Sequence, residues 1–219
     1  MVAGDHEQPR CPVCETGILQ PFRTVAGIRY LRCGQCQATV MAPECRLTPD
    51  EERAVYALHN NEPEDGGYRR FLSKLSEPLL TKLTSGAQGL DFGCGPGPAL
   101  AGMMQEAGYE MALYDPFFHP TMSALERQYD FITCTEVVEH LYRPAEVFRQ
   151  LDSLLKPGGW LGIMTCFQTD DDRFDHWHYR RDPTHVVFYR ELTLAWLADH
   201  YGWQFEVPCK DVVLFRKEG

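Results

Sequence analysis

LDFGCGPG, residues 90–97, lies where a short apolar run gives way to a segment with helical periodicity. Its glycines permit a tight turn and let a ligand approach the bare backbone. The helix that follows offers unpaired N–H groups at its N-terminus. The spacing is G-x-G-x-G and differs from the G-x-G-x-x-G of dinucleotide-binding turns. We therefore expect a buried strand at 89–93, a helix at 98–107 and a ligand-binding turn between them; a tight turn without a ligand is the alternative.

Outward from this turn, predicted strands and helices alternate to the end of the chain. Alternation of this kind predicts a largely parallel sheet with right-handed crossovers and helices on both faces, a Rossmann-like α/β fold. The further strands are expected at 109–115, 129–135, 160–165, 204–207 and 212–216, and the further helices at 144–155 and 191–200.

The stretch from Leu90 resembles motif I of class I S-adenosylmethionine (SAM)-dependent methyltransferases, which is an acid, one residue and then G-x-G-x-G. Three more landmarks of that family follow in order: Asp115 at the end of the next strand, 129–141 as the fourth strand and its turn, and 155–161 as the entry to the fifth. The resemblance covers about 86–219. It implies SAM as cofactor, S-adenosylhomocysteine as product and an enzyme of the transferase class.

The same resemblance places the cofactor. An acid at the position of Asp115 holds the ribose, because a carboxylate accepts two hydrogen bonds from a vicinal diol. Only thirteen residues separate Asp115 from Tyr129, so the crossover in which the family places a helix and a third strand must be short. The adenine is expected near 123–126. The cofactor-binding residues implied are Tyr68, Asp91, Gly93, Cys94, Gly95, Gly97, Asp115, Pro116, Cys134, Thr135 and Glu136.

Two CxxC pairs, Cys11 with Cys14 and Cys33 with Cys36, are separated by 18 residues. This spacing is typical of four-thiolate zinc sites. Such a shell is tetrahedral and closed, so the expected Zn²⁺ is structural. The residues between the pairs suit a hairpin turning at Gly27. The ribbon has almost no core of its own, so the metal would supply much of its folding free energy. Unrelated free thiols or a redox pair are the alternatives.

The composition and periodicity of the sequence predict three parts of the chain. Residues 1–47 form the zinc ribbon, 48–85 a helical linker or lid, and 86–219 the SAM-binding methyltransferase domain. The linker begins with a capping box at 48–51 and a helix running to about His59. A second helix starts near Gly67 and carries Tyr68 on its first turn. Closing this part over the cofactor would exclude water.

The segment 166–190 follows the fifth predicted strand and carries HWHYRRDPTHVVFY at 176–189. Ligands bind at the carboxyl ends of parallel strands, so a long segment there is a candidate acceptor wall. His178 and His185 are candidate bases for an acceptor proton, with Asp182 orienting them. Alternatively the histidines are structural, or His176, His178, Asp182 and His185 bind a second metal. His140 is expected to pack below the cofactor, and 170–172 to form a solvated loop.

The net charge of −10 favours a small-molecule or a carrier- or glycan-linked acceptor over nucleic acid. An RNA methyltransferase is the alternative enzyme, with Arg23, Arg29, Arg32 and Arg46 giving the ribbon some positive charge. A SAM-binding regulatory protein without catalysis is a third class, which the fold alone does not exclude. No apolar run is long enough to span a bilayer, and the first ten residues lack a secretory h-region, so we expect a cytoplasmic protein without a membrane partner.

Overall fold

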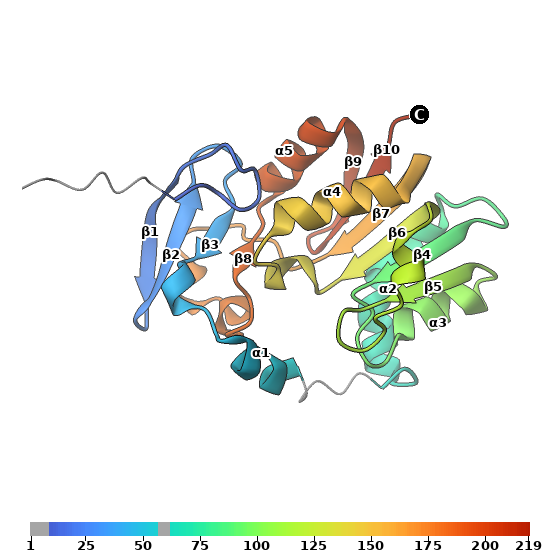
Figure 1. Cartoon of the computed structure of the whole chain (residues 1–219), viewed down its shortest axis with the longest axis horizontal. Coiled ribbons are helices and arrows are strands. Elements are labelled where there is room, and N and C mark those ends of the chain that lie inside the picture. The colour runs from blue at the N-terminus through green and yellow to red at the C-terminus, as the bar shows by residue number, and fades with distance from the viewer. Residues whose placement is uncertain (1–8, 57–61) are drawn as a thin grey trace, which may run out of the picture.

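The computed structural model describes residues 9–56 and 62–219 and contains two sheets (Figure 1). The larger sheet has the strand order β5-β4-β6-β7-β10-β9, and the smaller has the order β1-β2-β3-β8. The larger sheet comprises β4 (Gln88–Phe92), β5 (Glu110–Tyr114), β6 (Tyr129–Thr135), β7 (Leu155–Met164), β9 (Trp203–Cys209) and β10 (Val212–Lys217). The smaller comprises β1 (Leu19–Val25), β2 (Ile28–Cys33), β3 (Thr39–Met41) and β8 (Val187–Phe188).

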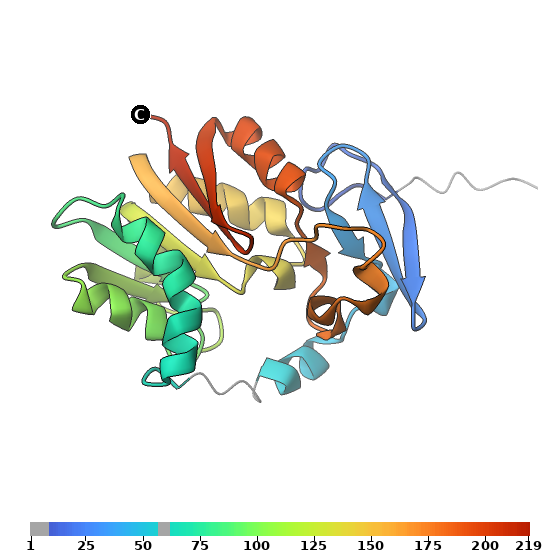
Figure 2. The same ribbon diagram turned by 180° about the vertical axis from the view of Figure 1, so that it is seen from behind.

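The larger sheet is parallel from β5 to β7 and ends in two antiparallel strands. One face is covered by α2 (Gly66–Leu80) and α3 (Ala99–Glu106), and the other by α4 (Pro144–Leu154) and α5 (Glu191–Tyr201) (Figures 1 and 2). Strand β10 supplies both cores, because Val212 and Leu214 pack on the α2 side while Val213 and Phe215 pack on the other. This is the period-two alternation of a strand buried on both faces. The predicted α/β fold class is confirmed.

Strand β7 begins earlier than the sequence predicts. Leu155 already pairs with Tyr129, and the register then shifts so that Trp160 pairs with Phe131. The residues between them bulge out of the ladder, and Gly158 there has a φ of 77°. The Pro-Gly-Gly sequence therefore ends the helix as expected but lies within the strand, because glycine accommodates the irregular backbone of a bulge.

The crossover between β5 and β6 is short, as the thirteen-residue spacing predicts. Its residues, all of which the structure describes, contain the 3₁₀ turn η2 (Met122–Leu125) and no further strand that could pair with β5. Strand β5 is therefore the edge strand of the larger sheet. Before η2, the chain doubles back at Asp115, whose backbone N–H donates to the carbonyl of His119 at 3.0 Å and whose carbonyl accepts from His119 N–H. This turn places apolar side chains beside the glycine turn of β4.

The ribbon shares its sheet with the segment 166–190. The β1–β2 hairpin turns through Ala26 and Gly27, both at positive φ, as the sequence predicts for Gly27. Strand β3 then pairs with β8, with Thr39 opposite Phe188. The segment also contains two 3₁₀ turns, η4 (Phe174–His176) and η5 (His178–Arg181). The boundary expected between 1–47 and 86–219 is thus crossed by one continuous sheet.

Side-chain contacts reinforce that junction. The guanidinium of Arg32 lies 2.8 Å from a carboxylate oxygen of Asp171, and the hydroxyl of Thr39 donates to Gln168 at 2.6 Å. The rings of Tyr30 and Phe174 meet edge-to-face with centroids 4.9 Å apart. Asp171 is therefore part of the junction, whereas the sequence suggested a solvated loop for the whole of 170–172.

The two helices expected at 48–85 differ in their packing. Helix α2 buries Leu72, Leu75 and Leu79 against the larger sheet and belongs to its core. Helix α1 (Pro49–Tyr56), which follows the 3₁₀ turn η1 (Pro43–Cys45), has no fully buried residue and lies at the open end of the parallel strands. The predicted extension of α1 to His59 falls outside the described residues. None of the helices within 9–56 and 62–219 combines the length and apolarity needed to cross a bilayer.

Candidate active site

The glycine turn after β4 forms one wall of a cleft. Gly93 and Gly95 have φ angles of 76° and 65°, a conformation that residues with a Cβ rarely adopt. A Cβ at Gly93 would also lie 2.4 Å from Cγ2 of Val137. The turn is held because Gly93 N–H donates to the carbonyl of Tyr114 at 2.7 Å. Glycine is required here both by backbone conformation and by space.

The cleft has a volume of about 360 Å³, within the roughly 300–1,000 Å³ of small-molecule sites. It lies at the carboxyl ends of β4, β5 and β6, where open α/β sheets bind ligands. Its walls come from the glycine turn, the 115–119 turn, the end of β6 and helices α1 and α2. The polar lining residues are Glu52, Tyr56, Tyr68, Asp91, Tyr114, Asp115, Thr135, Glu136, His140 and Gln150.

Asp115 is held rigidly at this wall. One of its carboxylate oxygens accepts from the N–H of Gly95 at 3.1 Å, and the other from the N–H groups of Phe117 and Phe118 at 2.8 and 3.0 Å. Asp91 lies below the turn, 2% exposed, and accepts from the hydroxyl of Thr133 at 2.7 Å. Burial raises the pKa of Asp91 to about 6. Three backbone N–H groups thus fix the lining carboxylate of Asp115.

Most of the predicted cofactor residues meet in this cleft. Nine of them line it: Tyr68, Asp91, Gly93, Cys94, Gly95, Asp115, Pro116, Thr135 and Glu136. Gly97 is buried and is not part of the lining. Cys134 is fully buried in the core, because it alternates with Thr135 along β6 and faces the opposite side. Residues 123–126 are also outside the cleft, and the half-exposed rings of Phe117 and Phe118 line it instead.

The end of β6 carries a buried acidic pair. Glu136 has a φ of 52°, an uncommon left-handed conformation for a side-chain-bearing residue, and it lines the cleft. Glu139 follows on η3 (Val138–His140) and is 0% exposed. The hydroxyl of Tyr179 lies 3.1 Å from Glu136 and also hydrogen-bonds Glu139. Burial, together with the charge of Glu139, raises the pKa of Glu136 to about 8.

His140 lies in the wall of the cleft, next to that acidic pair. From the sequence, His140 is expected below the cofactor as a packing residue, and no role is predicted for Glu139. The signal was present in the Glu-Val-Val-Glu-His run directly after β6, at the strand end where ligands bind. The ring of His185 meets that of His140 with centroids 4.7 Å apart, although the two residues are far apart in sequence.

The structure separates the three predicted catalytic residues. His185 is 6% exposed, lies behind His140 and does not line the cleft itself. Asp182 is 3.8 Å from His185 Nε2 and accepts from Thr184 N–H at 2.9 Å. His178 is exposed on η5 and is outside the lining. At 3.8 Å Asp182 makes no hydrogen bond to His185, so the orienting role expected of it stays a prediction, and His178 is not brought to the cleft.

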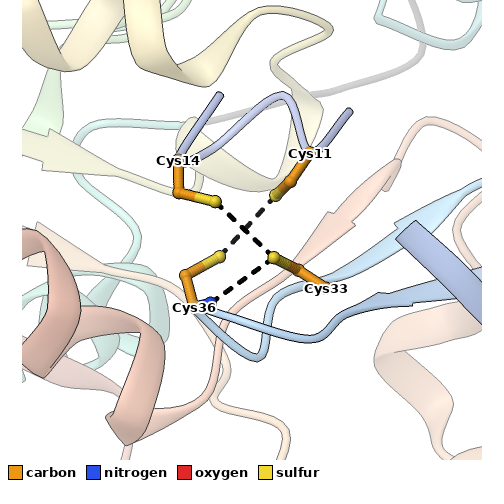
Figure 3. Close-up of side chains that lie close together, drawn as sticks. All are labelled: Cys11, Cys14, Cys33 and Cys36. Atoms are coloured by element: carbon orange, nitrogen blue, oxygen red, sulfur yellow. Dashed lines mark hydrogen bonds between the residues drawn. The ribbon is translucent and has the colours of Figure 1, made fainter. Parts of the chain in front are cut away.

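The four predicted metal ligands meet in one buried cluster. The sulfur atoms of Cys11 and Cys36 are 3.6 Å apart and those of Cys14 and Cys33 are 3.5 Å apart, and all four point inward (Figure 3). A tetrahedral zinc ion with Zn–S bonds of about 2.3 Å separates its sulfurs by roughly 3.8 Å. A disulfide would require about 2.05 Å. The spacing therefore fits a four-thiolate metal site.

Backbone N–H groups donate to two sulfur atoms of this cluster. The N–H of Gly17 donates to Cys14 Sγ at 3.3 Å, and the N–H of Gln35 donates to Cys33 Sγ at 3.4 Å. A Cβ at Gly17 would lie 2.4 Å from Cys33 Sγ, so only glycine fits there. A hydrogen bond from Cys36 lowers the pKa of the Cys11 thiol to about 6, and the same bond, with burial, raises the pKa of the Cys36 thiol, so the two sulfurs share a proton unless a metal replaces it.

Comparisons with known proteins agree with this geometry. A family model described as a methyltransferase domain matches residues 65–206. The ubiquinone biosynthesis O-methyltransferase of Marinobacter nauticus is 34% identical over 106 residues, which span 37% of this chain and 44% of that protein. The enzyme of the same name from Serratia proteamaculans is 37% identical over 82 residues, 36% of this chain and 34% of that protein. The matched part thus covers less than half the length of these relatives.

Among solved structures, an O-methyltransferase family protein from Burkholderia thailandensis superposes with a TM-score of 0.51 at 15% identity, covering 77% of this chain and 63% of that one. At that identity the likeness shows the fold alone. The family model covers well over half of the chain, and the glycine turn that it includes forms the cleft expected of a SAM site. The chain therefore belongs to the methyltransferase domain family, whose fold here is that of the class I SAM-dependent enzymes.

Proposed function

We propose that the protein transfers the methyl group of SAM to a hydroxyl oxygen of a small-molecule or carrier-linked acceptor. One observation carries the proposal: a single cleft is lined both by the glycine turn and Asp115 and by Glu136 and His140. The names of the curated relatives, which are O-methyltransferases, support an oxygen acceptor. SAM would lie over the glycine turn, with its ribose on Asp115.

Different residues of the cleft would hold the cofactor and the acceptor. Methyl transfer from a sulfonium is an in-line displacement, so the enzyme must hold the acceptor oxygen on the line of the breaking bond. The glycine turn and the rigid carboxylate of Asp115 would fix the cofactor. The acceptor hydroxyl would meet the part of the lining formed by Tyr56, Glu136 and His140, here called the acceptor end, where its proton must be removed. Helix α1 covers that end and keeps bulk water from the reacting atoms.

We further propose that the four-cysteine cluster binds one zinc ion with a structural role. The ion would complete a closed shell and offers no position for a substrate. The loop that carries Cys11 and Cys14 contacts α4, because Ala145 N–H donates to the carbonyl of Pro12 at 3.1 Å and Arg149 pairs with Glu15 at 2.6 Å. Zinc would also stiffen β3. Because β3 pairs with β8, it would in turn stiffen the segment that holds His185.

The ribbon's arginines have partners inside the chain. Arg29 pairs with Glu44, and Arg32 lies 2.8 Å from Asp171. Arg23 is within 3.6 Å of Asp172, and the guanidinium of Arg46 lies 5.1 Å from the ring centre of Tyr142. Phosphate binding needs cations that are free to replace counterions. This pairing favours the small-molecule reading over RNA docking by the ribbon.

The proposal is tested by incubating the protein with methyl-labelled SAM and, separately, with extracted metabolites and with extracted RNA. We expect the label to enter a compound in the metabolite pool and to be absent from RNA. Label recovered in RNA would instead establish the alternative acceptor.

Asp115→Ala tests the cofactor end of the cleft. We expect it to weaken SAM binding by about 1.5–3 kcal/mol, the scale of hydrogen bonds to a charged group, which is roughly tenfold or more in Kd. Calorimetry measures the change, and Asp199→Ala on the exposed face of α5 is the matched control. Equal SAM affinity in a folded Asp115→Ala protein would place the ribose elsewhere.

A further inference from the structure

We infer that Glu139, His140 and His185 form a second metal site, separate from the four cysteines, that binds a divalent cation at the acceptor end of the cleft. One ligand atom from each of the three residues can be chosen so that all lie within 4.8 Å of one another. Two imidazoles and a carboxylate are a recurrent protein ligand set for such ions. The second metal site considered from the sequence comprised His176, His178, Asp182 and His185; of these His185 belongs to the present cluster, while His176 and His178 are exposed on η4 and η5.

The hydrogen bonds of both histidines present the same nitrogen for coordination. Nδ1 of His185 lies 2.7 Å from the carbonyl oxygen of Tyr179, and Nδ1 of His140 lies 3.2 Å from that of Thr184. A carbonyl oxygen can only accept, so each Nδ1 donates its proton, and in the neutral imidazole Nε2 is then the nitrogen with the coordinating lone pair. Metal-binding histidines usually donate their second N–H to a carbonyl or a carboxylate in this way.

Glu139 supplies a buried carboxylate that lacks a conventional counter-charge. Its Oε1 accepts from Tyr179 and lies 3.8 Å from His140 Nε2. Its Oε2 is buried and accepts no hydrogen bond from the residues that the structure describes. No lysine or arginine within the described ranges forms an ion pair with it. Buried charges are normally paired or bound to a metal, so an ion fits this environment.

The backbone brings the three ligands together across a long separation in sequence. Val186 N–H donates to the carbonyl of Glu139 at 2.8 Å, which fixes β8 against η3. Asp182 accepts from Thr184 N–H and so shapes the turn just before His185. The site is thus built on two segments held by main-chain hydrogen bonds, which gives it a defined geometry before any ligand arrives.

The role of the cation rests on the proposed function. His140 lines the cleft, so an ion on these three residues would adjoin the acceptor, and three protein ligands leave coordination positions for it. A coordinated hydroxyl loses its proton more readily. The oxygen then bonds to the methyl carbon as the S–C bond breaks. The products are the methyl ether, S-adenosylhomocysteine and one proton released to solvent.

The test measures Mn²⁺ binding to the full chain with its ribbon zinc in place and without SAM or acceptor. We expect electron paramagnetic resonance titration to give about one Mn²⁺ per chain, and Mn²⁺ to raise the melting temperature, because an ion that binds only the folded state stabilises it. Glu139→Gln and His185→Gln should each bind Mn²⁺ at least about tenfold more weakly, since loss of a partner one shell further out already costs that much. His176→Ala removes a nearby exposed histidine and should bind as the parent does.

Two results would overturn the site. One is a folded parent protein that takes up no Mn²⁺, Mg²⁺ or Zn²⁺ beyond the ribbon ion. The other is unchanged Mn²⁺ binding in both glutamine variants. Because the titration needs no turnover, methyl transfer by a protein that binds no second ion would reject the cation and retain the proposed function. A protein that binds the second ion but transfers no methyl group would retain the cation site and reject the proposed function.

Discussion

Protein carrying Cys33→Ser should contain no zinc and should melt about 10 °C or more below the parent. Cys33 is 0% exposed, and its sulfur lies 3.5 Å from Cys14 Sγ, so a serine hydroxyl removes one of four ligands from a closed shell. Loss of a structural zinc removes several kcal/mol of the free energy that stabilises the folded state. Each kcal/mol shifts the melting temperature of a chain of this size by roughly 2–4 °C. Elemental analysis measures the zinc content, and thermal unfolding measures the melting temperature.

The matched control for that experiment is Cys209→Ser. Cys209 is a partly buried thiol on β9 that lies outside the four-cysteine cluster. It should keep about one zinc per chain and show a much smaller change in melting temperature. A Cys33→Ser protein that retains its zinc, or that loses zinc and melts like the parent, would show that the ribbon does not depend on this ion.

His140→Ala should lower kcat by about 100-fold or more, while SAM affinity changes little. His140 lines the cleft, but the residues proposed to hold the cofactor are the glycine turn and Asp115. Removing a group that assists proton transfer typically costs 10²–10⁴ in rate. Loss confined to kcat identifies an interaction made in the transition state. Steady-state kinetics and calorimetry with SAM separate the two effects.

A purely structural role for His140 predicts a different pattern. The ring contacts His185 with centroids 4.7 Å apart, so its removal would then loosen the core and lower the melting temperature in proportion to the loss of activity. His176→Ala, an exposed change on η4 outside the cleft lining, is the control for removing a histidine that does not line the cleft. Near-parental kcat in a folded His140→Ala protein would exclude His140 from the reaction.

The parts of this molecule that follow from local rules could be predicted from sequence. Gly93 and Gly95 predict a turn that favours glycine, and the two CxxC pairs predict that the four cysteines lie together. The alternation of apolar runs gives the strands and helices of the larger sheet. Side chains alternate between the two faces of a strand, so Cys134 and Thr135 must face opposite sides of the sheet. This alternation would have excluded Cys134 from the predicted cofactor residues.

The acceptor end depends on contacts between distant segments, which no local pattern encodes. His185 reaches Glu139 because β8 joins the ribbon sheet and Val186 donates to the carbonyl of Glu139. The pairing of β3 with β8 has no turn signature, since the partners lie in different expected domains. For the same reason His178 looked equivalent to His185 in sequence, although the 3₁₀ turn η5 leaves it exposed.

The most direct test of the central claim is a count of products by mass spectrometry. The zinc-containing protein is incubated with methyl-labelled SAM and a pool of hydroxylated small molecules. The account predicts S-adenosylhomocysteine and a methyl ether in equal amounts, with formation slowed in Asp115→Ala and in His140→Ala. SAM that binds to the cleft but yields neither product with any acceptor pool would contradict the account, and would assign the protein to the SAM-binding proteins without catalysis.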